Sequence, residues 1–378
     1  MIIKNASVYT EDGQFVEKDI FIEGHIFTDS ADKVTDGELI DAAGCYAVPG
    51  LTDIHFHGCV GHDFSDGTRE AIDALAVYQL SVGVTNIVPA TMTLSEEALS
   101  GICQTAAAYA EEGFHERRAR FRGINMEGPF LSPKKLGAQN PAYVRKPDLA
   151  LFDSLIEASG GRVKLLDLAP EEEGAEELIR KRHDTCVMSL AHTCADYDTA
   201  IRAFDAGAVH MTHLYNAMNP YSHRSPGPIG AAVDRERVEV ELIADGVHSH
   251  PAAVRAAFKL FGEKRIILIS DSMRATGLAD GDYTLGGQDV KVVGKLATLG
   301  NGSIAGSVTN LLDCVRTAVL RMGIPLEAAI RCAAVNPARC VGIDGECGSI
   351  TPGKRADVLL LRKEDLALER VVFEGSLL

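Results

Sequence analysis

Hydrophobic and polar positions divide the chain into two textures. Up to about residue 50, short apolar runs alternate with polar turn signals, as at 11–13 and 23–24. This punctuation is typical of β-strands joined by tight turns. Beyond Leu51 the apolar runs are longer, and segments with a helical period separate them. The pattern predicts a small β region followed by a larger α/β region.

The larger region contains eight apolar runs that alternate with amphipathic segments. Continuous apolar strands separated by helices predict a parallel sheet that is buried on both faces. Eight repeats predict a (β/α)₈ TIM-like barrel, in which the chemistry sits at the C-terminal ends of the strands. The predicted strands occupy residues 51–58, 85–91, 121–128, 163–170, 186–193, 209–215, 238–246 and 265–272, and clear helical segments occupy 68–81, 95–110, 195–206 and 251–261.

The C-terminal segment returns to a β-like texture, so we expect it to pair with the N-terminal strands. The predicted organisation is a small β-sandwich domain formed by residues 1–50 and 340–378, and a catalytic barrel over 51–339. Three loops are longer than barrel connections require, which is typical of lids and substrate contacts. They cover residues 129–147, 216–233 and 273–307, and the last contains a predicted hairpin at 283–299.

Charge and composition narrow the function. The formal net charge of −16 over 378 residues argues against binding to nucleic acids or membrane surfaces, so an anionic substrate would need a local basic cluster. Nine cysteines without a C-x-x-C pair fit reduced thiols. The N-terminus lacks a leader pattern, and no run approaches the ~20 apolar residues of a membrane span. We therefore expect a cytoplasmic protein.

The strongest candidate chemistry lies where the first predicted strand ends, at His55 and His57. Side chains at positions i and i+2 of a strand share a face, so both imidazoles can converge on one point. Two neutral imidazoles on one face are a natural start for a divalent metal site. The alternative is a pair of hydrogen-bonded core histidines.

Further metal-ligating residues end other predicted strands. Glu127 ends the third, before Gly-Pro, and His192 and His213 end the fifth and sixth. Their placement in one ring with the two earlier histidines favours the metal site. His210, three residues before His213, is expected on the opposite face and is left out of the site.

Asp271 ends the eighth predicted strand. A carboxylate there can take a proton from an attacking water and return it to the leaving group. A metal ligand or a helix cap are the alternatives for this residue. The sequence offers no convincing Ser-His-Asp order, nucleophile elbow, phosphate loop or dinucleotide fingerprint.

These residues, in this order, resemble the amidohydrolase superfamily. Many of its members carry a carboxylated lysine at the end of strand 4, whereas Lys164 lies near the start of that run and Glu127 ends strand 3. That departure narrows the resemblance to the N-acetylglucosamine-6-phosphate deacetylase family. The motifs that carry it lie at residues 48–53, 127–130, 191–193, 212–218, 244–248 and 270–271.

The resemblance implies hydrolysis of the acetamide of N-acetyl-D-glucosamine 6-phosphate, which gives acetate and D-glucosamine 6-phosphate. Glu127, His192 and His213 would hold the main divalent metal cation, with zinc or iron as the first candidates, and Asp271 would be the base and then the acid. Some relatives replace the first-strand histidines and bind one metal. His55 and His57 are intact here, so a second metal bridged by Glu127 is implied.

The resemblance also implies how the substrate is held. The phosphate would meet a guanidinium and an imidazole, a suitable pair for an anion, and a homodimer or higher homo-oligomer would supply a further phosphate contact. Many relatives carry a histidine at Gln139, and glutamine donates a hydrogen bond without carrying charge. The implied phosphate contacts are Arg224 and His248, and the implied sugar contacts are Asn216, Ala217, Ala305 and Gly306, with Gln139 near the substrate carbonyl.

Three other functions remain open at this point. A close alternative acts on the galactosamine epimer or another N-acyl amino sugar. A more distant one is a cyclic-amide hydrolase or aminohydrolase of the same superfamily, for which a bridging lysine on strand 4 is expected. A sugar-phosphate sensor without catalysis is the third, although a base beside a metal site has little use in a pure binder.

Overall fold

A parallel sheet forms the centre of the larger region in the computed structural model, which describes residues 1–35, 37–113 and 116–378. Six strands follow one another in order and in parallel. Most of their buried side chains are apolar, as expected for a sheet that is covered on both faces. The strands are β11 (Ile124–Glu127), β12 (Val163–Leu168), β13 (Val187–Leu190), β14 (His210–Met211), β15 (Glu239–Ile243) and β16 (Ile266–Ile269).

Two further parallel strands, β6 (Leu51–Asp53) and β9 (Val84–Ile87), complete the ring, and the short β10 (Arg120–Phe121) pairs with β9. A parallel bridge between Ala90 and Asn125 joins this sheet to β11. On the other side, the amide nitrogen of Asp271 donates to the carbonyl oxygen of His55 at 2.9 Å. The predicted strand order is confirmed, and with it the α/β barrel.

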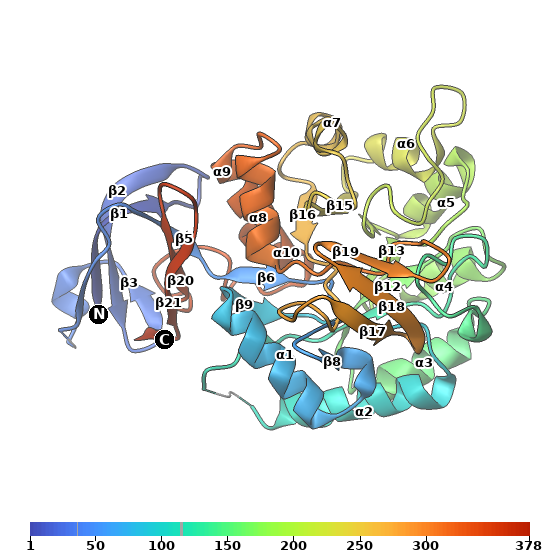
Figure 1. Cartoon of the computed structure of the whole chain (residues 1–378), viewed down its shortest axis with the longest axis horizontal. Helices are drawn as coiled ribbons and strands as arrows, with labels where there is room; N and C mark the ends of the chain where they lie inside the picture. The colour runs from blue at the N-terminus through green and yellow to red at the C-terminus, as the bar shows by residue number, and fades with distance from the viewer. Residues whose placement is uncertain (36, 114–115) are drawn as a thin grey trace.

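Helices cover the outside of the barrel (Figure 1). Several begin at a side chain that caps free backbone N–H groups, as Thr68 does for α1 and Ser95 for α2. The predicted helical segments 68–81 and 95–110 begin at these two residues. The helices are α1 (Arg69–Ser81), α2 (Glu96–Glu111), α3 (Leu149–Ala158), α4 (Ala175–Arg182), α5 (Tyr197–Ala206), α6 (Gly227–Val233), α7 (Pro251–Phe261), α8 (Leu311–Leu320), α9 (Leu326–Ile330) and α10 (Asn336–Cys340), with the π-helical η4 (Arg331–Val335) before α10.

The two ends of the chain share a second, mixed sheet beside the barrel (Figure 1). Its central contact is antiparallel, with Val358 opposite Pro49 and Arg362 opposite Cys45. The predicted pairing of the terminal segments is confirmed, while the exact limits 1–50 and 340–378 stay a prediction. The strands are β1 (Ile2–Tyr9), β2 (Phe15–Glu23), β3 (Ile26–Thr28), β4 (Leu39–Asp41), β5 (Cys45–Pro49), β20 (Val358–Arg362), β21 (Leu368–Phe373) and β22 (Ser376–Leu377).

The loop after β16 folds into an antiparallel sheet of β17 (Gly281–Leu285), β18 (Gln288–Val293) and β19 (Leu296–Leu299). The predicted hairpin is therefore one part of a three-stranded sheet. Its apolar face packs on Met92 and Met273, and Gln288 Nε2 donates to the carbonyl oxygen of Ala138 at 2.6 Å. The shorter elements are β7 (Gly58–Cys59), β8 (His62–Asp63), and the 3-10 turns η1 (Ala31–Lys33), η2 (Phe64–Asp66) and η3 (Pro141–Tyr143).

Within the described residues, every helix is too short or too polar to traverse a bilayer.

Candidate active site

Three predicted ligands meet at the C-terminal ends of neighbouring strands. Glu127 is the last residue of β11, and His192 and His213 follow β13 and β14. Glu127 Oε1 lies 3.0 Å from His192 Nε2 and 3.1 Å from His213 Nε2, and the two nitrogens are 3.2 Å apart. All three side chains are buried. We call them the first ligand group.

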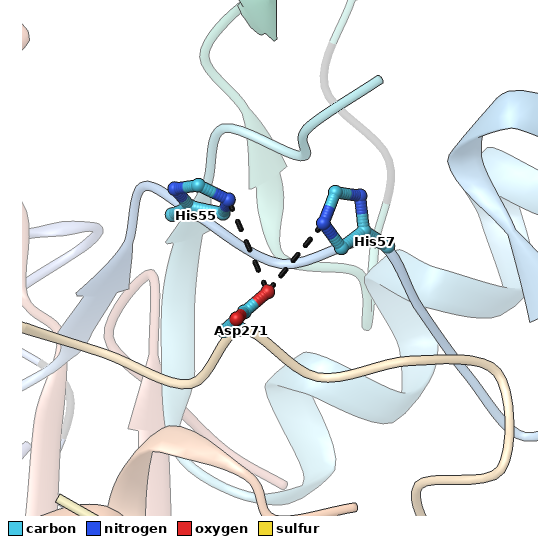
Figure 2. Close-up of side chains that lie close together, drawn as sticks. All are labelled: His55, His57 and Asp271. Atoms are coloured by element: carbon cyan, nitrogen blue, oxygen red, sulfur yellow. Dashed lines mark ion pairs between the residues drawn. The ribbon is translucent and has the colours of Figure 1, made fainter. Parts of the chain in front are cut away.

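A second ligand group consists of His55, His57 and Asp271. Figure 2 shows the two rings directed at the Asp271 carboxylate from the segment that follows β6. Asp271 Oδ1 lies 3.4 Å from His57 Nε2 and 3.9 Å from His55 Nε2. Glu127 joins the groups, because its Oε2 is 3.3 Å from His57 Nε2 and its Oε1 is 3.6 Å from His55 Nε2.

The backbone bends sharply where these side chains leave their strands. His192, His213 and Asp271 have φ angles of 43°, 29° and 48°, in the left-handed region that residues other than glycine rarely adopt. Such conformations persist only where the surrounding structure holds them, and they cluster at functional sites. The turns aim each side chain into the ring rather than along its strand.

The donor set fits a divalent metal. Imidazole nitrogens and carboxylate oxygens suit borderline cations such as zinc, iron, manganese or cobalt. In addition, His55 Nε2 is buried without a hydrogen-bond partner among the described residues, while it faces Glu127 and Asp271. A buried polar atom of this kind is unfavourable unless something binds it. Both groups therefore have the composition and the burial of amidohydrolase metal sites.

Backbone carbonyls hold two of the histidines. His192 Nδ1 lies 2.7 Å from the carbonyl oxygen of Lys135, and His57 Nδ1 lies 3.3 Å from that of Ala90. A carbonyl oxygen accepts a hydrogen bond from Nδ1–H, which leaves the Nε2 lone pair directed into the site. The sequence reading missed both partners, because a backbone acceptor leaves no signal in the amino-acid pattern.

His55 is held differently, by a side chain that the sequence reading also missed. Its Nδ1 lies 2.9 Å from Oε2 of Glu241, a fully buried residue of β15. Here a signal existed, since Glu241 is a charged residue in the middle of a run predicted to be a buried strand. Buried carboxylates are rare unless they are paired.

Electrostatics keep both central carboxyls ionised. Burial raises the pKa of Glu127 and of Asp271, but the imidazoles around them outweigh burial. The pKa of Glu127 is held well below its usual value, and His57 and His55 hold that of Asp271 below its usual value. Asp271 is therefore a carboxylate at neutral pH and is ready to accept a proton.

A cavity of about 300 Å³ opens over both groups. The β17–β19 sheet supplies part of its wall through Leu285. The cavity thus lies at the C-terminal ends of the barrel strands, where the barrel prediction placed the chemistry. Its lining includes His57, Met92, Glu127, Gln139, His192, His213, Asn216, Ala217, His248, Asp271, Ile304 and Gly306.

Comparison with known proteins points to the same family as the geometry of the site. The sequence model of the Amidohydrolase family matches residues 46–378. The N-acetylglucosamine-6-phosphate deacetylase of Bacillus subtilis (strain 168) is 37% identical over 370 residues, which cover 96% of this chain and 93% of that protein. This chain belongs to the N-acetylglucosamine-6-phosphate deacetylase family of the amidohydrolases.

One further sequence and one solved structure are similar to this chain. An N-acetylgalactosamine-6-phosphate deacetylase of Escherichia coli O157:H7 is 37% identical over 331 residues, which cover 87% of this chain and 86% of that protein. A solved structure of a mutant N-acetyl-D-glucosamine-6-phosphate deacetylase from Mycobacterium smegmatis, in complex with N-acetyl-D-glucosamine-6-phosphate, has a TM-score of 0.92 and 33% identity. That likeness covers 100% of this chain and 98% of the other.

Gln139, which the resemblance placed near the substrate carbonyl, lies beside the two ligand groups. Its Nε2 donates to Glu127 Oε2, and its Oε1 accepts from the backbone nitrogen of Thr93 at 2.8 Å. The amide is therefore anchored on both sides and lies against the carboxylate that joins the two ligand groups.

Of the substrate contacts that the family resemblance implies, some line the cavity and others do not. Asn216, Ala217 and Gly306 line the cavity, as expected. Ala305 is fully buried, and its neighbours Ile304 and Gly306 face the cavity instead. Arg224 lies exposed in the loop that precedes α6 and is not part of the cavity wall.

His248 lines the cavity and forms a pair with Asp245. Its Nδ1 lies 2.8 Å from Asp245 Oδ2, and Asp245 Oδ1 accepts from the backbone nitrogens of Val247 and His248. Burial lowers the pKa of His248, but the bond to Asp245 outweighs it and raises the pKa above its usual value. The ring is thus biased toward the cationic form that attracts an anion.

Proposed function

We propose that this chain hydrolyses the acetamide of N-acetyl-D-glucosamine 6-phosphate to acetate and D-glucosamine 6-phosphate. The observation that carries the proposal is the ionised Asp271, 3.4 Å from His57 at the mouth of the barrel. A base in that place beside two ligand groups suits hydrolysis of an unreactive amide. The likeness to deacetylases over nearly the full chain supports the same reaction.

We propose that the first ligand group holds one divalent cation, and that His55, His57 and Glu127 hold a second. Zinc or iron are the expected metals. When bound, such a cation supplies Lewis acidity that polarises the acetamide carbonyl and makes water more acidic. The imidazoles contribute by presenting Nε2 lone pairs, since Nδ1 of His55, His57 and His192 is engaged elsewhere.

Asp271 moves the proton. As a carboxylate it accepts a proton from the water that attacks the acetamide carbon. It then donates this proton to the amide nitrogen, so that the amino sugar leaves as a neutral amine. The lowered pKa of Asp271 keeps its carboxylate ionised, so that it is available to accept the proton in the first transfer. The second is favoured by the basicity that the nitrogen gains as the C–N bond breaks.

Recognition of the sugar phosphate is assigned to the outer part of the cavity. His248 offers a cation that Asp245 stabilises, and Asn216 together with the backbone at Ala217 and Gly306 surrounds the sugar. A protein with a net charge of −16 repels anions at long range, so a local cation matters for a phosphate. Arg224 would serve the phosphate only if its loop, or a loop of a second subunit, approached the cavity.

One second substrate is favoured by a specific observation. The N-acetylgalactosamine-6-phosphate deacetylase of Escherichia coli O157:H7 and the N-acetylglucosamine-6-phosphate deacetylase of Bacillus subtilis (strain 168) are both 37% identical to this chain. The two amino sugars differ only in the configuration of the hydroxyl group at C4. We therefore keep the galactosamine epimer as the second candidate.

The test compares acetate release from three sugars: the 6-phosphates of N-acetylglucosamine and N-acetylgalactosamine, and unphosphorylated N-acetylglucosamine. Protein purified without added metal is analysed for metal in parallel. We expect the highest kcat/KM on N-acetylglucosamine 6-phosphate, with at least one metal per chain. Faster turnover of the galactosamine epimer would select the second candidate, and equal rates with and without phosphate would contradict both.

We also propose a homodimer, as the family resemblance implies. Light scattering after size-exclusion chromatography measures the mass directly, and a mass of one chain near 40.4 kDa would contradict it.

A further inference from the structure

A polar layer lies inside the barrel directly beneath the two ligand groups. Its members come from four consecutive strands or strand ends, and all are fully buried. Thr212 Oγ1 donates to Asp167 Oδ1 at 2.7 Å, and Ser189 Oγ lies 2.6 Å from Thr212 Oγ1 and 2.9 Å from His210 Nδ1. Barrel interiors are usually filled with branched apolar side chains. A layer of this kind therefore calls for an explanation.

Glu241 makes the closest contact between the layer and the ligands, since Asp167 Oδ2 lies 4.0 Å from His55 Nδ1. Glu241 Oε2 accepts from His55 Nδ1 at 2.9 Å and from the backbone nitrogen of His213 at 3.1 Å. One oxygen therefore holds a ligand of each group. The described ion pairs of Glu241 involve only imidazoles, those of His55 and His210. A buried carboxylate with no lysine or arginine partner is costly to desolvate.

Two of the other ligand histidines have neutral partners at Nδ1, and Nδ1 of His213 has no hydrogen-bond partner among the described residues. His192 and His57 rest on backbone carbonyl oxygens, which fix a ring without adding charge. A carboxylate partner also fixes the ring, and in addition its negative charge makes the opposite nitrogen a better electron donor. His55 is thus the one described ligand histidine with a charged partner at Nδ1.

The geometry assigns Glu241 as a positioning residue that builds the second metal position by holding His55 Nδ1–H with a negative charge, so that His55 Nε2 points at Glu127 and Asp271. The inference rests on the proposed function, which places metals in the two groups. It goes further by predicting that the second position depends on a residue that contacts no metal.

Two substitutions separate charge from geometry. Glu241→Gln keeps the size of the side chain and an oxygen that can accept from His55 and His213, but it removes the charge. Glu241→Leu removes both. The matched control is Glu239→Gln, because Glu239 is the first residue of the same strand, is only partly buried and pairs with Arg339.

The experiment titrates metal-free protein with Zn²⁺ and measures stoichiometry and affinity by equilibrium dialysis with elemental analysis. We expect two sites in the unmodified chain and in Glu239→Gln. Glu241→Gln should weaken only the second site, by about 10- to 100-fold, and Glu241→Leu should leave one site. Circular dichroism and thermal unfolding of the metal-free variants check that they fold.

Several outcomes would overturn the assignment: a single site in the unmodified chain, two sites of unchanged affinity in Glu241→Gln, or equal weakening of both sites. If neither Glu241 variant folds, nitrogen-15 shifts of the ring of His55 in the zinc-loaded unmodified protein decide, because the assignment requires the proton on Nδ1 and the metal on Nε2. The opposite arrangement would refute it. Two bound metals without any deacetylation would instead refute the proposed function and leave the role of Glu241 intact.

Discussion

The two ligand groups use similar residues, yet the fold supports them in different ways. In the first group, three side chains from β11 and from the ends of β13 and β14 converge within 3.0–3.2 Å. In the second, the distances to Asp271 are 3.4 and 3.9 Å, and one ligand depends on the buried charge of Glu241.

This difference implies that the two groups have different roles. The tighter first group suits a permanently held metal. The looser second group includes the ionised Asp271, which suits proton transfer. Asp271 is the one carboxylate of the second group, and it is 8% exposed whereas Glu127 is 2% exposed, so it can meet substrate from the cavity. The comparison can be tested residue by residue.

The largest effect is expected for Glu127→Ala, because Glu127 contacts histidines of both groups. We expect both metals to be lost and deacetylation to fall to the background rate. Elemental analysis of the purified variant measures the metal. Retention of one full equivalent would show that the two groups are independent, which contradicts the shared role of Glu127.

The next effect is expected for Asp271→Asn. Asparagine keeps the shape of the side chain but cannot accept the proton, so kcat should fall by about 10²- to 10⁴-fold, the usual contribution of a general base. The KM should change little, since the substitution leaves the cavity wall in place. Steady-state kinetics measure both parameters. Unchanged kcat would remove Asp271 from the mechanism.

A smaller and selective effect is expected when His57→Asn is compared with His192→Asn. Loss of His57 should lower the affinity for the second metal while the first remains, because the first group keeps its three ligands. Loss of His192 should lower the affinity for the first metal. Zinc titration of the two metal-free variants distinguishes them. If both variants lost the same metal, the two groups would form a single site.

The smallest effect concerns phosphate recognition and its pH dependence. His248 binds phosphate best while protonated, so the KM for the 6-phosphate should rise as the pH rises through the raised pKa of His248. In Asp245→Asn the pairing charge is gone, burial lowers that pKa, and the rise in KM should begin at a lower pH. The rise in KM should reach about tenfold, which corresponds to the free energy of one hydrogen bond to a charged group.

The same pH series on the unphosphorylated sugar is the control for that prediction, since its KM should not respond to His248. The stability of the folded chain should depend on the protonation of His248 in the same direction as phosphate binding does. A raised histidine pKa contributes stability that is fully present below about pH 6.5 and is lost as the pH rises through the raised value.

Much of the fold could be predicted because its signals are local. A buried strand shows as a run of apolar residues, and an amphipathic helix shows as apolar residues that recur with a helical period. The ligands Glu127, His192 and His213 were found for the same reason, since each stands where an apolar run stops. The parallel order of the strands then brought them together.

Other features depend on contacts between distant segments. Nothing near Glu241 in the sequence reveals that its carboxylate meets His55, which is 186 positions away. Likewise, His210 was expected on the opposite face of its strand from His213 and was left out of the site, yet its Nε2 lies 3.9 Å from Glu241 Oε1 in the buried layer. Gln139 was expected at the substrate, and the structure anchors its amide on Glu127 and Thr93.

The sequence by itself thus determined the barrel, the pairing of the chain ends and the placement of the candidate ligands at the strand ends, because burial and strand alternation are encoded within a few neighbouring residues. Only the tertiary structure decided how those ligands divide into two groups, which atom orients each ring, and that Arg224 lies outside the cavity wall. Those features are set by distances between residues far apart in the chain, and such distances exist only once the barrel has closed.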